Sequence, residues 1–349
     1  MRNLKKIAIF FGGYSTEYEV SLQSAYAVIE GMDTTRYEPI LIGIDRYTGA
    51  WFWYQGKNER IKEDSWQSEQ SCISVFPSLD QKIHGLCYLE KDRLQTISLD
   101  AALPILHGKN GEDGTVQGVL KLMGVPVIGC GLLSSALCMD KELAHCIVRM
   151  NGIKTARSAT IQEGYLEESV KKAALELGYP LFVKPVRSGS SFGITKVAKE
   201  QELFLAVEKA FEHDSTVLLE EMIEGFEVGC AILGKEELLL GAVDEIELSD
   251  GFFDYTEKYT LQTSKIHVPA RISPEKAEEI KRAALTIYRV LGCSHFARVD
   301  LFLTPMGEIY FNEVNTIPGF TSHSRYPNML KEAGLSFEEI IHRLLEMEG

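Results

Sequence analysis

A short, fully apolar run near the start of the chain, Ile7 to Phe11, ends in the pair Gly12-Gly13. An apolar run without alternation is typical of a buried parallel strand, and the two glycines indicate a tight turn after it. The segments that we expect to follow are helices at 19–31 and 116–123 and strands at 37–44, 99–106 and 125–128. Strands that alternate with helices predict a parallel α/β sheet.

The sequence changes character after about Asp140, where short β-rich runs surround few helices. The expected helices are 141–150, 166–177, 274–291 and 336–347, and the expected strands are 180–185, 194–197, 217–221 and 228–233, with a hairpin around Gly307. Three domains result: an N-terminal α/β domain (1–130), a central domain (131–220) and a C-terminal domain (221–349). Residues 47–95 hold Trp51, Trp53 and Trp66 among polar residues and are expected to form an irregular insertion.

Composition excludes several classes of protein. The 349 residues include 36 basic and 50 acidic side chains, a net charge of 36 − 50 = −14, which argues against a nucleic-acid surface. No apolar run approaches the roughly 18 residues that cross a membrane, and the apolar run near the start is too short for a signal peptide. Seven cysteines without a Cys-x-x-Cys pair favour reduced thiols in a cytoplasm over disulfides or a zinc site.

Two predicted strands near the end of the chain carry carboxylates at alternating positions. Alternation puts Asp300 on the same face as Phe302, and it groups Phe311, Glu313 and Asn315 on one face of the next strand. Turn residues between the strands predict an antiparallel hairpin. Hard oxygen ligands from two strands suit Mg²⁺, which lets phosphates and water complete its shell. The alternative is a solvated hairpin face.

A loop rich in glycine and serine follows Lys184 at the end of a predicted strand. Its glycines and backbone amides suit close contact with phosphates, although a Walker A sequence is absent from the chain. The loop also contains G-x-S-x-G, which would make Ser191 a hydrolase nucleophile. That motif requires a helix directly after it, whereas residues 194–197 favour a strand. A purely structural turn is the third reading.

Two further segments follow predicted strands of the N-terminal domain. Glu17 lies in the first turn of the helix after Gly12-Gly13, where the helix dipole favours a carboxylate and backbone donors can hold an anion. His107 opens the loop His107-Gly-Lys-Asn-Gly-Glu-Asp-Gly114 at the carboxyl end of a strand, where substrate-binding loops lie in such sheets. Each residue also has an ordinary structural role open to it, as a helix cap or as a capped loop histidine.

Seven motifs in this order resemble the D-alanine–D-alanine ligase family of the ATP-grasp superfamily. They are Gly12-Gly13…Glu17-x-Glu19-Val-Ser21, His107-Gly-x-x-Gly-Glu-Asp-Gly114, Met139-Asp-Lys141, Lys184-Pro-x-Arg-x-Gly-Ser-Ser191, Tyr255-x-x-Lys-Tyr259, Arg298-x-Asp300 and Asn312-Glu-x-Asn-Thr-x-Pro-Gly319. The resemblance implies an ATP-grasp fold of α/β and α+β type, in which a parallel N-terminal domain precedes two domains that hold ATP. It also implies that ATP phosphorylates a D-alanine carboxylate, and that a second substrate's amine attacks the acyl phosphate.

The resemblance implies roles for individual residues. ATP would be bound by Lys141, Lys184, Ser190, Ser191, Glu220, Glu221, Ile223, Glu227, Lys258 and Asn312. Two Mg²⁺ or Mn²⁺ ions would be bound by Asp300, Glu313 and Asn315. The residues that would act in catalysis are Glu17, Ser190, Tyr259, Lys258 and Arg298, with a lid at about 249–265 that excludes water. Glu17 would hold the first D-alanine's ammonium, with His107 close by, and Gly319, Ser324, Arg325 and Phe252 would complete the substrate site. The family also suggests a homodimer.

The second-substrate segment departs from ordinary dialanine ligases. These usually have His-Ser-Leu where this chain has His323-Ser-Arg325. An arginine there, together with the lid segment Phe252 to Tyr259, is similar to the D-alanine–D-serine ligases of vancomycin resistance. An arginine can pair with a serine hydroxyl, which leucine would leave unpaired. D-alanine and D-serine are therefore the expected substrates, with ordinary dialanine synthesis as the alternative, and a non-catalytic nucleotide sensor as an alternative of another class.

Overall fold

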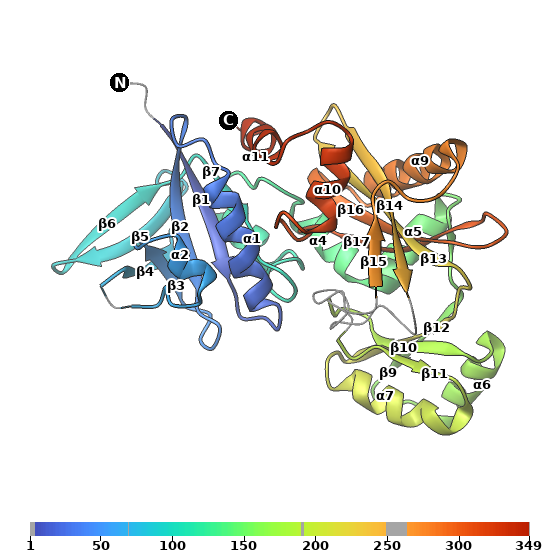
Figure 1. Ribbon diagram of the computed structural model, residues 1–349. Coiled ribbons are helices and arrows are strands. Elements are labelled where there is room, and N and C mark those ends of the chain that lie inside the picture. Colours follow the sequence, from blue (N-terminus) through green and yellow to red (C-terminus); the bar gives the residue numbers. More distant parts are fainter. Residues whose placement is uncertain (1–3, 69, 190–191, 249–263, 349) are drawn as a thin grey trace.

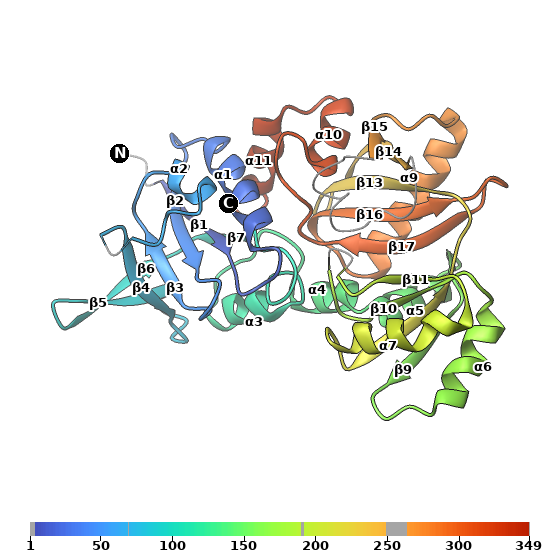
Figure 2. The same cartoon turned by 60° about the horizontal axis from the view of Figure 1, so that its bottom comes forward.

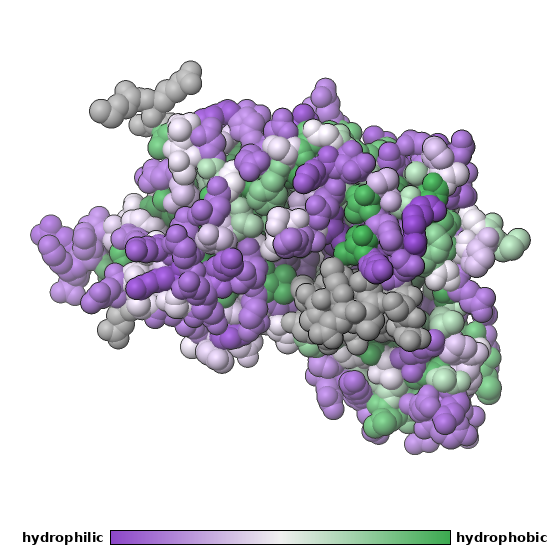
Figure 3. All heavy atoms as spheres, viewed as in Figure 1, coloured by the Kyte–Doolittle hydropathy of each residue, from purple (hydrophilic) through white to green (hydrophobic). Residues whose placement is uncertain are grey.

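The computed structural model describes residues 4–68, 70–189, 192–248 and 264–348, whose strands form three sheets (Figures 1 and 2). None of the described helices is both long and apolar enough to span a membrane. Hydrophilic side chains predominate over the N-terminal sheet on the face shown in Figure 3.

The N-terminal sheet has seven strands in the order β6-β5-β4-β3-β2-β1-β7. They are β1 (Lys5–Gly12), β2 (Tyr37–Ile44), β3 (Trp51–Tyr54), β4 (Cys72–Pro77), β5 (Gly85–Glu90), β6 (Arg93–Ser98) and β7 (Ala101–Pro104). Strand β1 lies between β2 and β7 and is parallel to both, which confirms the predicted parallel centre. The strand predicted at 125–128 is wrong, because only Val127 makes a bridge there, to Ala102.

The prediction of an irregular insertion at 47–95 is also wrong. This segment supplies strands β3 to β6 and the short helix α2 (Glu59–Lys62), and the strands extend the sheet in antiparallel order. Trp66 is completely buried, with its ring edge-to-face against Phe11 and Tyr54. Its Nε1 donates to the Tyr18 hydroxyl at 2.8 Å. The tryptophan therefore belongs to the core of the N-terminal sheet.

Helices α1 to α5 lie between the start of this sheet and the first strand of the six-stranded sheet. Besides α2 they are α1 (Tyr18–Glu30), α3 (Thr115–Leu122), α4 (Leu132–Met139) and α5 (Lys141–Met150). The Asp140 carboxylate caps α5 by accepting from the Leu143 amide at 3.0 Å. The cap fixes the position at which this helix begins and hence the place of Lys141.

The four-stranded sheet has the order β11-β10-β12-β9. Its strands are β9 (Ser158–Gln162), β10 (Leu181–Pro185), β11 (Thr195–Val197) and β12 (Thr216–Glu221), and its helices are α6 (Glu167–Leu177) and α7 (Leu203–Phe211), with a 3₁₀ turn at Glu200–Glu202. The sequence analysis had not predicted α7. Because β11 is a strand, the segment after the glycine-serine loop lacks the helix that a hydrolase nucleophile requires.

The six-stranded sheet has the order β15-β14-β13-β16-β17-β8. Its strands are β8 (Lys154–Thr155), β13 (Phe226–Gly234), β14 (Leu239–Leu248), β15 (Ser264–His267), β16 (His295–Leu303) and β17 (Ile309–Asn315), and its helices are α9 (Pro274–Val290), α10 (Arg325–Glu332) and α11 (Phe337–Glu346). Strands β16 and β17 form the predicted antiparallel hairpin. Helix α10 was not predicted.

A bulge in this hairpin changes one predicted face. Asp300 pairs with Glu313, but Leu301 pairs with Phe311, so that Asn312 is an extra residue. Phe311 therefore packs in the same core as Leu301, on the side of the sheet opposite to Asp300. The prediction that Phe311 shares a face with Glu313 is wrong because strict alternation ends at the bulge.

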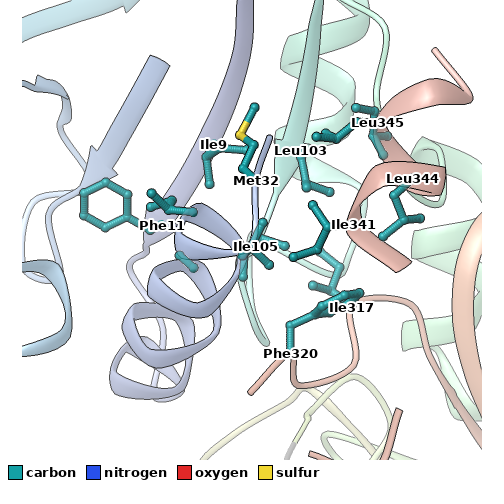
Figure 4. Packing of buried hydrophobic residues seen from close by; sticks show 14 of the residues in the cluster. Ile9, Phe11, Met32, Leu103, Ile105, Ile317, Phe320, Ile341, Leu344 and Leu345 are labelled. Atoms are coloured by element: carbon teal, nitrogen blue, oxygen red, sulfur yellow. The ribbon is translucent and has the colours of Figure 1, made fainter. Parts of the chain in front are cut away.

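The end of the chain packs against its beginning. Ile341, Leu344 and Leu345 of α11 lie in one apolar cluster with Ile9 of β1 and Leu103 of β7 (Figure 4). Ile317 and Phe320, which follow β17, belong to the same cluster. This shared core places the loop after β17 beside the carboxyl ends of the N-terminal parallel strands.

Replacement of Trp66 by alanine tests whether residues 47–95 are part of the core. We expect Trp66→Ala to lower the free energy of unfolding by about 3–5 kcal/mol, since it removes a fully buried ring. The control Tyr47→Ala, at a side chain that is 77% exposed, should change it by less than about 0.5 kcal/mol. Urea unfolding followed by circular dichroism measures both. Equal, small effects would show that Trp66 does not anchor this segment.

Candidate active site

A cavity of about 530 Å³ lies where the N-terminal sheet, the start of α5 and the β16–β17 hairpin meet. Most of its wall comes from segments that the sequence motifs had singled out. The predicted site residues that line it are Glu17, His107, Lys141, Arg298, Glu313, Asn315, Gly319, Ser324 and Arg325. Residues from three distant parts of the chain are thus brought to one place.

Glu17 is the residue before the first turn of α1 and is only 5% exposed. Two glycines make room for its carboxylate. A Cβ built on Gly108 would overlap Glu17 Oε2, and one built on Gly189 would lie 2.8 Å from the same oxygen. The loop after Lys184 therefore reaches Glu17 directly, which a larger residue at 108 or 189 would prevent.

His107 is buried and uncharged at neutral pH. Burial lowers its pKa to about 4, and the nearby Arg298 guanidinium acts in the same direction. Its Nε2 lies 3.1 Å from the Ser24 hydroxyl oxygen, and that oxygen accepts from the Phe320 amide at 3.2 Å. Through Ser24 the histidine is held by helix α1 and by the loop after β17.

Glu112 is a cavity residue to which the sequence analysis gave no role. Its carboxylate accepts from the Gly108 amide at 2.8 Å and from the Ile317 amide at 3.2 Å, and so joins the two loops. Burial, followed by the negative charge of Glu17, raises its pKa to about 8. Two carboxyl groups in one buried corner suit a cationic ligand such as an amino-acid ammonium. The sequence feature that could have identified Glu112 is its position inside the 107–114 motif.

The acidic hairpin face is built around Asp300, which is 1% exposed. Arg298 donates to its two oxygens at 2.7 and 2.6 Å, and the Asn315 amide donates at 2.7 Å. Glu313 pairs with Asp300 in the ladder and faces the cavity. These oxygen donors have the chemistry that Mg²⁺ prefers. Among the described residues no group of three or more His, Cys, Asp or Glu side chains could hold a metal by itself, so a nucleotide would have to supply further ligands.

Arg325 opens helix α10 and is held rigidly at the cavity wall. Its Nε and Nη2 donate to Asp244 at 2.7 and 2.9 Å, its Nη1 donates to Glu227 at 2.6 Å, and Asp300 lies 3.4 Å away. A guanidinium has five N–H groups. Three of them donate to Asp244 and Glu227, and Nη2 also lies within ion-pair distance of Asp300, which leaves the second N–H of Nη1 without a hydrogen-bond partner among the described residues. Asp244 was missed because nothing in the β14 pattern distinguishes it.

The residues predicted to bind the nucleotide lie mainly on the four-stranded sheet, outside the cavity lining. Lys184 Nζ donates to Glu220 Oε1 at 2.5 Å across β10 and β12. The Glu221 carboxylate holds Arg157, and the half-buried Ile223 follows β12. Lys141 lies nearer the cavity, where its Nζ donates to the Ser188 carbonyl at 2.6 Å.

Some predicted residues lie outside the described part of the chain. These are Ser190, Ser191, Phe252, Lys258 and Tyr259, together with most of the predicted lid.

The chain matches two models of one family, "D-ala D-ala ligase N-terminus" over residues 6–130 and "D-ala D-ala ligase C-terminus" over residues 147–346. It is 44% identical to the vancomycin C-type resistance protein VanC1 of Enterococcus gallinarum, over 99% of this chain and 98% of that one. It is 40% identical to a D-alanine–D-alanine ligase of Caldicellulosiruptor bescii, over 98% and 94%.

Among solved structures, the VanG D-Ala:D-Ser ligase of Enterococcus faecalis is 55% identical, with a TM-score of 0.93 over 99% of this chain and 100% of that one.

Two glycine substitutions test whether close packing against Glu17 matters for turnover. Gly108 and Gly152 both have positive φ, +73° and +81°, but a Cβ at Gly152 would meet nothing within 4 Å. Each alanine variant should lose about 1 kcal/mol of stability from backbone strain. Only Gly108→Ala should also lower kcat/KM, by roughly ten-fold or more, since it displaces Glu17. Phosphate release from ATP with D-amino acids measures this, and equal turnover in both variants would contradict it.

Proposed function

Because the chain belongs to the D-alanine–D-alanine ligase family of ATP-dependent ligases, we propose that it joins D-alanine to D-serine. The observation that best supports D-serine as the second substrate is the position of Arg325. Its guanidinium is fixed in the cavity wall by Asp244 and Glu227. The similarity of the chain to the D-Ala:D-Ser ligase of Enterococcus faecalis also supports this choice of substrate.

The corner around Glu17 is the proposed site of the first D-alanine. Glu17 supplies negative charge for its ammonium, and binding of that cation favours ionisation of Glu112, whose pKa burial and Glu17 raise. His107 lies beside them as a neutral group. The substrate carboxylate then points toward Arg298, which would stabilise the phosphoryl oxygens as the acyl phosphate forms.

The nucleotide is proposed to lie between the four-stranded sheet and the β16–β17 hairpin. Lys141 and Lys184 would bind its phosphates, while Glu220, Glu221, Ile223, Glu227 and Asn312 would contact adenine and ribose. Asp300, Glu313 and Asn315 would hold two Mg²⁺ or Mn²⁺ ions, whose chemistry is to neutralise phosphate charge. The roles proposed for Ser190, Ser191, Lys258 and Tyr259 follow from the family resemblance alone.

The second amino acid is proposed to bind beside Gly319, Ser324 and Arg325, with Phe252 contributing from the lid. Since the second N–H of Arg325 Nη1 lacks a hydrogen-bond partner among the described residues, a serine hydroxyl can accept from it directly or through water. D-alanine leaves the same donor unpaired. The amine of D-serine attacks the D-alanyl phosphate, the amide bond forms, and phosphate leaves with the electron pair of the broken C–O bond.

The setting of this reaction is part of the proposal. Altered peptidoglycan precursors that confer vancomycin resistance would be the result, as the names of several relatives suggest. We also propose that the protein is a cytoplasmic homodimer and that its domain boundaries lie near residues 130 and 220.

Replacement of Arg325 tests the choice of second substrate. Arg325→Leu should lower the D-Ala–D-Ser share of the product and raise the D-Ala–D-Ala share, by about ten- to a hundred-fold in ratio, the effect of one unpaired buried group. Mass spectrometry of products from equimolar D-alanine and D-serine measures it. The exposed Arg289→Leu is the control.

Two outcomes would overturn the D-serine assignment. These are mainly D-Ala–D-Ala from the wild type, which would indicate an ordinary dialanine ligase, or an unchanged ratio in Arg325→Leu. Because Asp244 is completely buried, a double variant with Asp244→Asn removes the unpaired carboxylate that the single variant leaves.

Removal of the proposed metal ligands should stop turnover. We expect Glu313→Gln and Asp300→Asn each to lower kcat by about a hundred-fold or more, the usual cost of one lost electrostatic group at a reacting centre. Chelation by EDTA should have the same effect, reversed by added Mg²⁺. Phosphate release measures all three, and full activity of both variants would contradict the metal assignment.

A further inference from the structure

His145 is a buried residue of helix α5 that contacts both sheets on either side of the proposed nucleotide site. It lies one turn after Lys141 and is 2% exposed. Its ring is edge-to-face with Phe311 of β17, and its imidazole faces Glu220 of β12. Neither the sequence motifs nor the proposed reaction gives this histidine a role.

The hydrogen bonds of the ring define its tautomer. His145 Nε2 lies 2.8 Å from the carbonyl oxygen of Asn312, the extra residue of the β17 bulge. A carbonyl only accepts, so Nε2 carries a hydrogen, and Nδ1 of the neutral ring is an acceptor. Nδ1 lies 3.7 Å from Glu220 Oε2. Both atoms are buried, and neither has a hydrogen-bond partner among the described residues.

The charges around the ring explain why two acceptors face each other. Burial lowers the pKa of His145; Glu220 opposes this, whereas Lys184 and Lys141 lower the pKa further. On β17 the ring meets the carbonyl of Asn312 and the ring of Phe311, which carry no charge. Burial by itself raises the pKa of Glu220, but the Lys184 ammonium that pairs with it outweighs burial and holds this pKa below its ordinary value.

We propose that His145 is a positioning residue for the nucleotide and that it replaces Lys184 as the donor to Glu220 when the lysine turns toward the phosphates. The proposal rests on the proposed function, in which Lys184 binds ATP. The geometry provides for the exchange, because Lys184 holds Oε1 of Glu220 and His145 faces Oε2. The same ring is fixed to β17 beside Glu313, so it ties the nucleotide side of the site to the metal side.

The exchange couples nucleotide binding to proton uptake. Departure of the Lys184 ammonium leaves a buried carboxylate that needs a cationic donor, and it removes a charge that disfavours the imidazolium. Both changes raise the pKa of His145. The ring then binds a proton at Nδ1 and donates to Glu220 and to Asn312 at once. Because the bound state holds the extra proton, nucleotide affinity should increase as the pH falls.

Calorimetry measures this proton directly. The full-length protein is titrated with the magnesium complex of a non-hydrolysable adenosine triphosphate analogue, in two buffers of different protonation enthalpy. In His145→Gln the side-chain amide still donates to Asn312 but cannot gain a proton. The matched control is His84→Gln, at a distant ring that also contacts a backbone carbonyl, Gly124 O at 2.9 Å.

Wild type and His84→Gln should take up protons on binding, and His145→Gln should take up fewer. His145→Gln should also raise KM for ATP by roughly ten-fold with a smaller change in kcat, as loss of one charge-assisted hydrogen bond predicts. Equal proton uptake in all three proteins, or an unchanged KM for ATP, would overturn the proposal.

Two measurements keep the test decisive. If His145→Gln does not fold, ¹⁵N spectra of the wild-type histidines with and without the analogue show whether His145 becomes an imidazolium; a ring that stays neutral overturns the proposal. Failure of the proposed function is distinguishable, since a wild type without ATP turnover or analogue binding would contradict that function and not the role of His145 alone.

Discussion

The active-site floor depends on a buried ion-pair network across three neighbouring strands. Asp244 of β14 and Asp300 of β16 lie on either side of Gly229 of β13, and Arg325 reaches over this glycine to both carboxylates. A Cβ at Gly229 would lie 2.6 Å from Arg325 Nη2 and 2.7 Å from Asp244 Oδ1. Only glycine leaves room for the guanidinium, so the backbone of β13 is part of the site.

Such a network is not the most stable way to fill this space, since desolvation of buried ions offsets much of their attraction. The charge that the network places at the active site explains its presence better than a contribution to stability does. Arg298 and Arg325 face Asp300, Asp244, Glu227 and Glu313, so the formal sum is +2 − 4 = −2. A floor with surplus negative charge and hard oxygen donors suits divalent cations, while the two arginines fix where the carboxylates point. The stability of this region therefore depends on complete pairing, and loss of any one member leaves a buried charge.

The sequence predicts best those features that depend on neighbours in the chain. The helix at 141–150 follows from its periodicity and its Asp140 cap, and the β16–β17 hairpin follows from its turn. Glu17, His107, Lys141 and Arg298, each from one of the seven motifs, line one cavity together with Arg325 of the second-substrate segment. Long-range packing was not predictable. Trp66 is a core residue only because Phe11 and Tyr54 surround it, and Asp244 is a site residue only because Arg325, 81 positions later, binds it. The bulge at Asn312 has no signal in the residues themselves, yet it moves Phe311 to the opposite face.

The same bulge connects the fold to its chemistry. Asn312, the extra residue of the bulge, accepts at its carbonyl from His145 Nε2 at 2.8 Å. On the other side of the site, Glu112 ties the Gly108 loop to the Ile317 amide, just beyond the end of β17. Strand β17 is thus held from two directions, by a histidine of α5 and by a glutamate of the N-terminal loop. Because Glu313 and Asn315 lie between these two anchors, the proposed metal ligands are positioned by groups that themselves respond to charge.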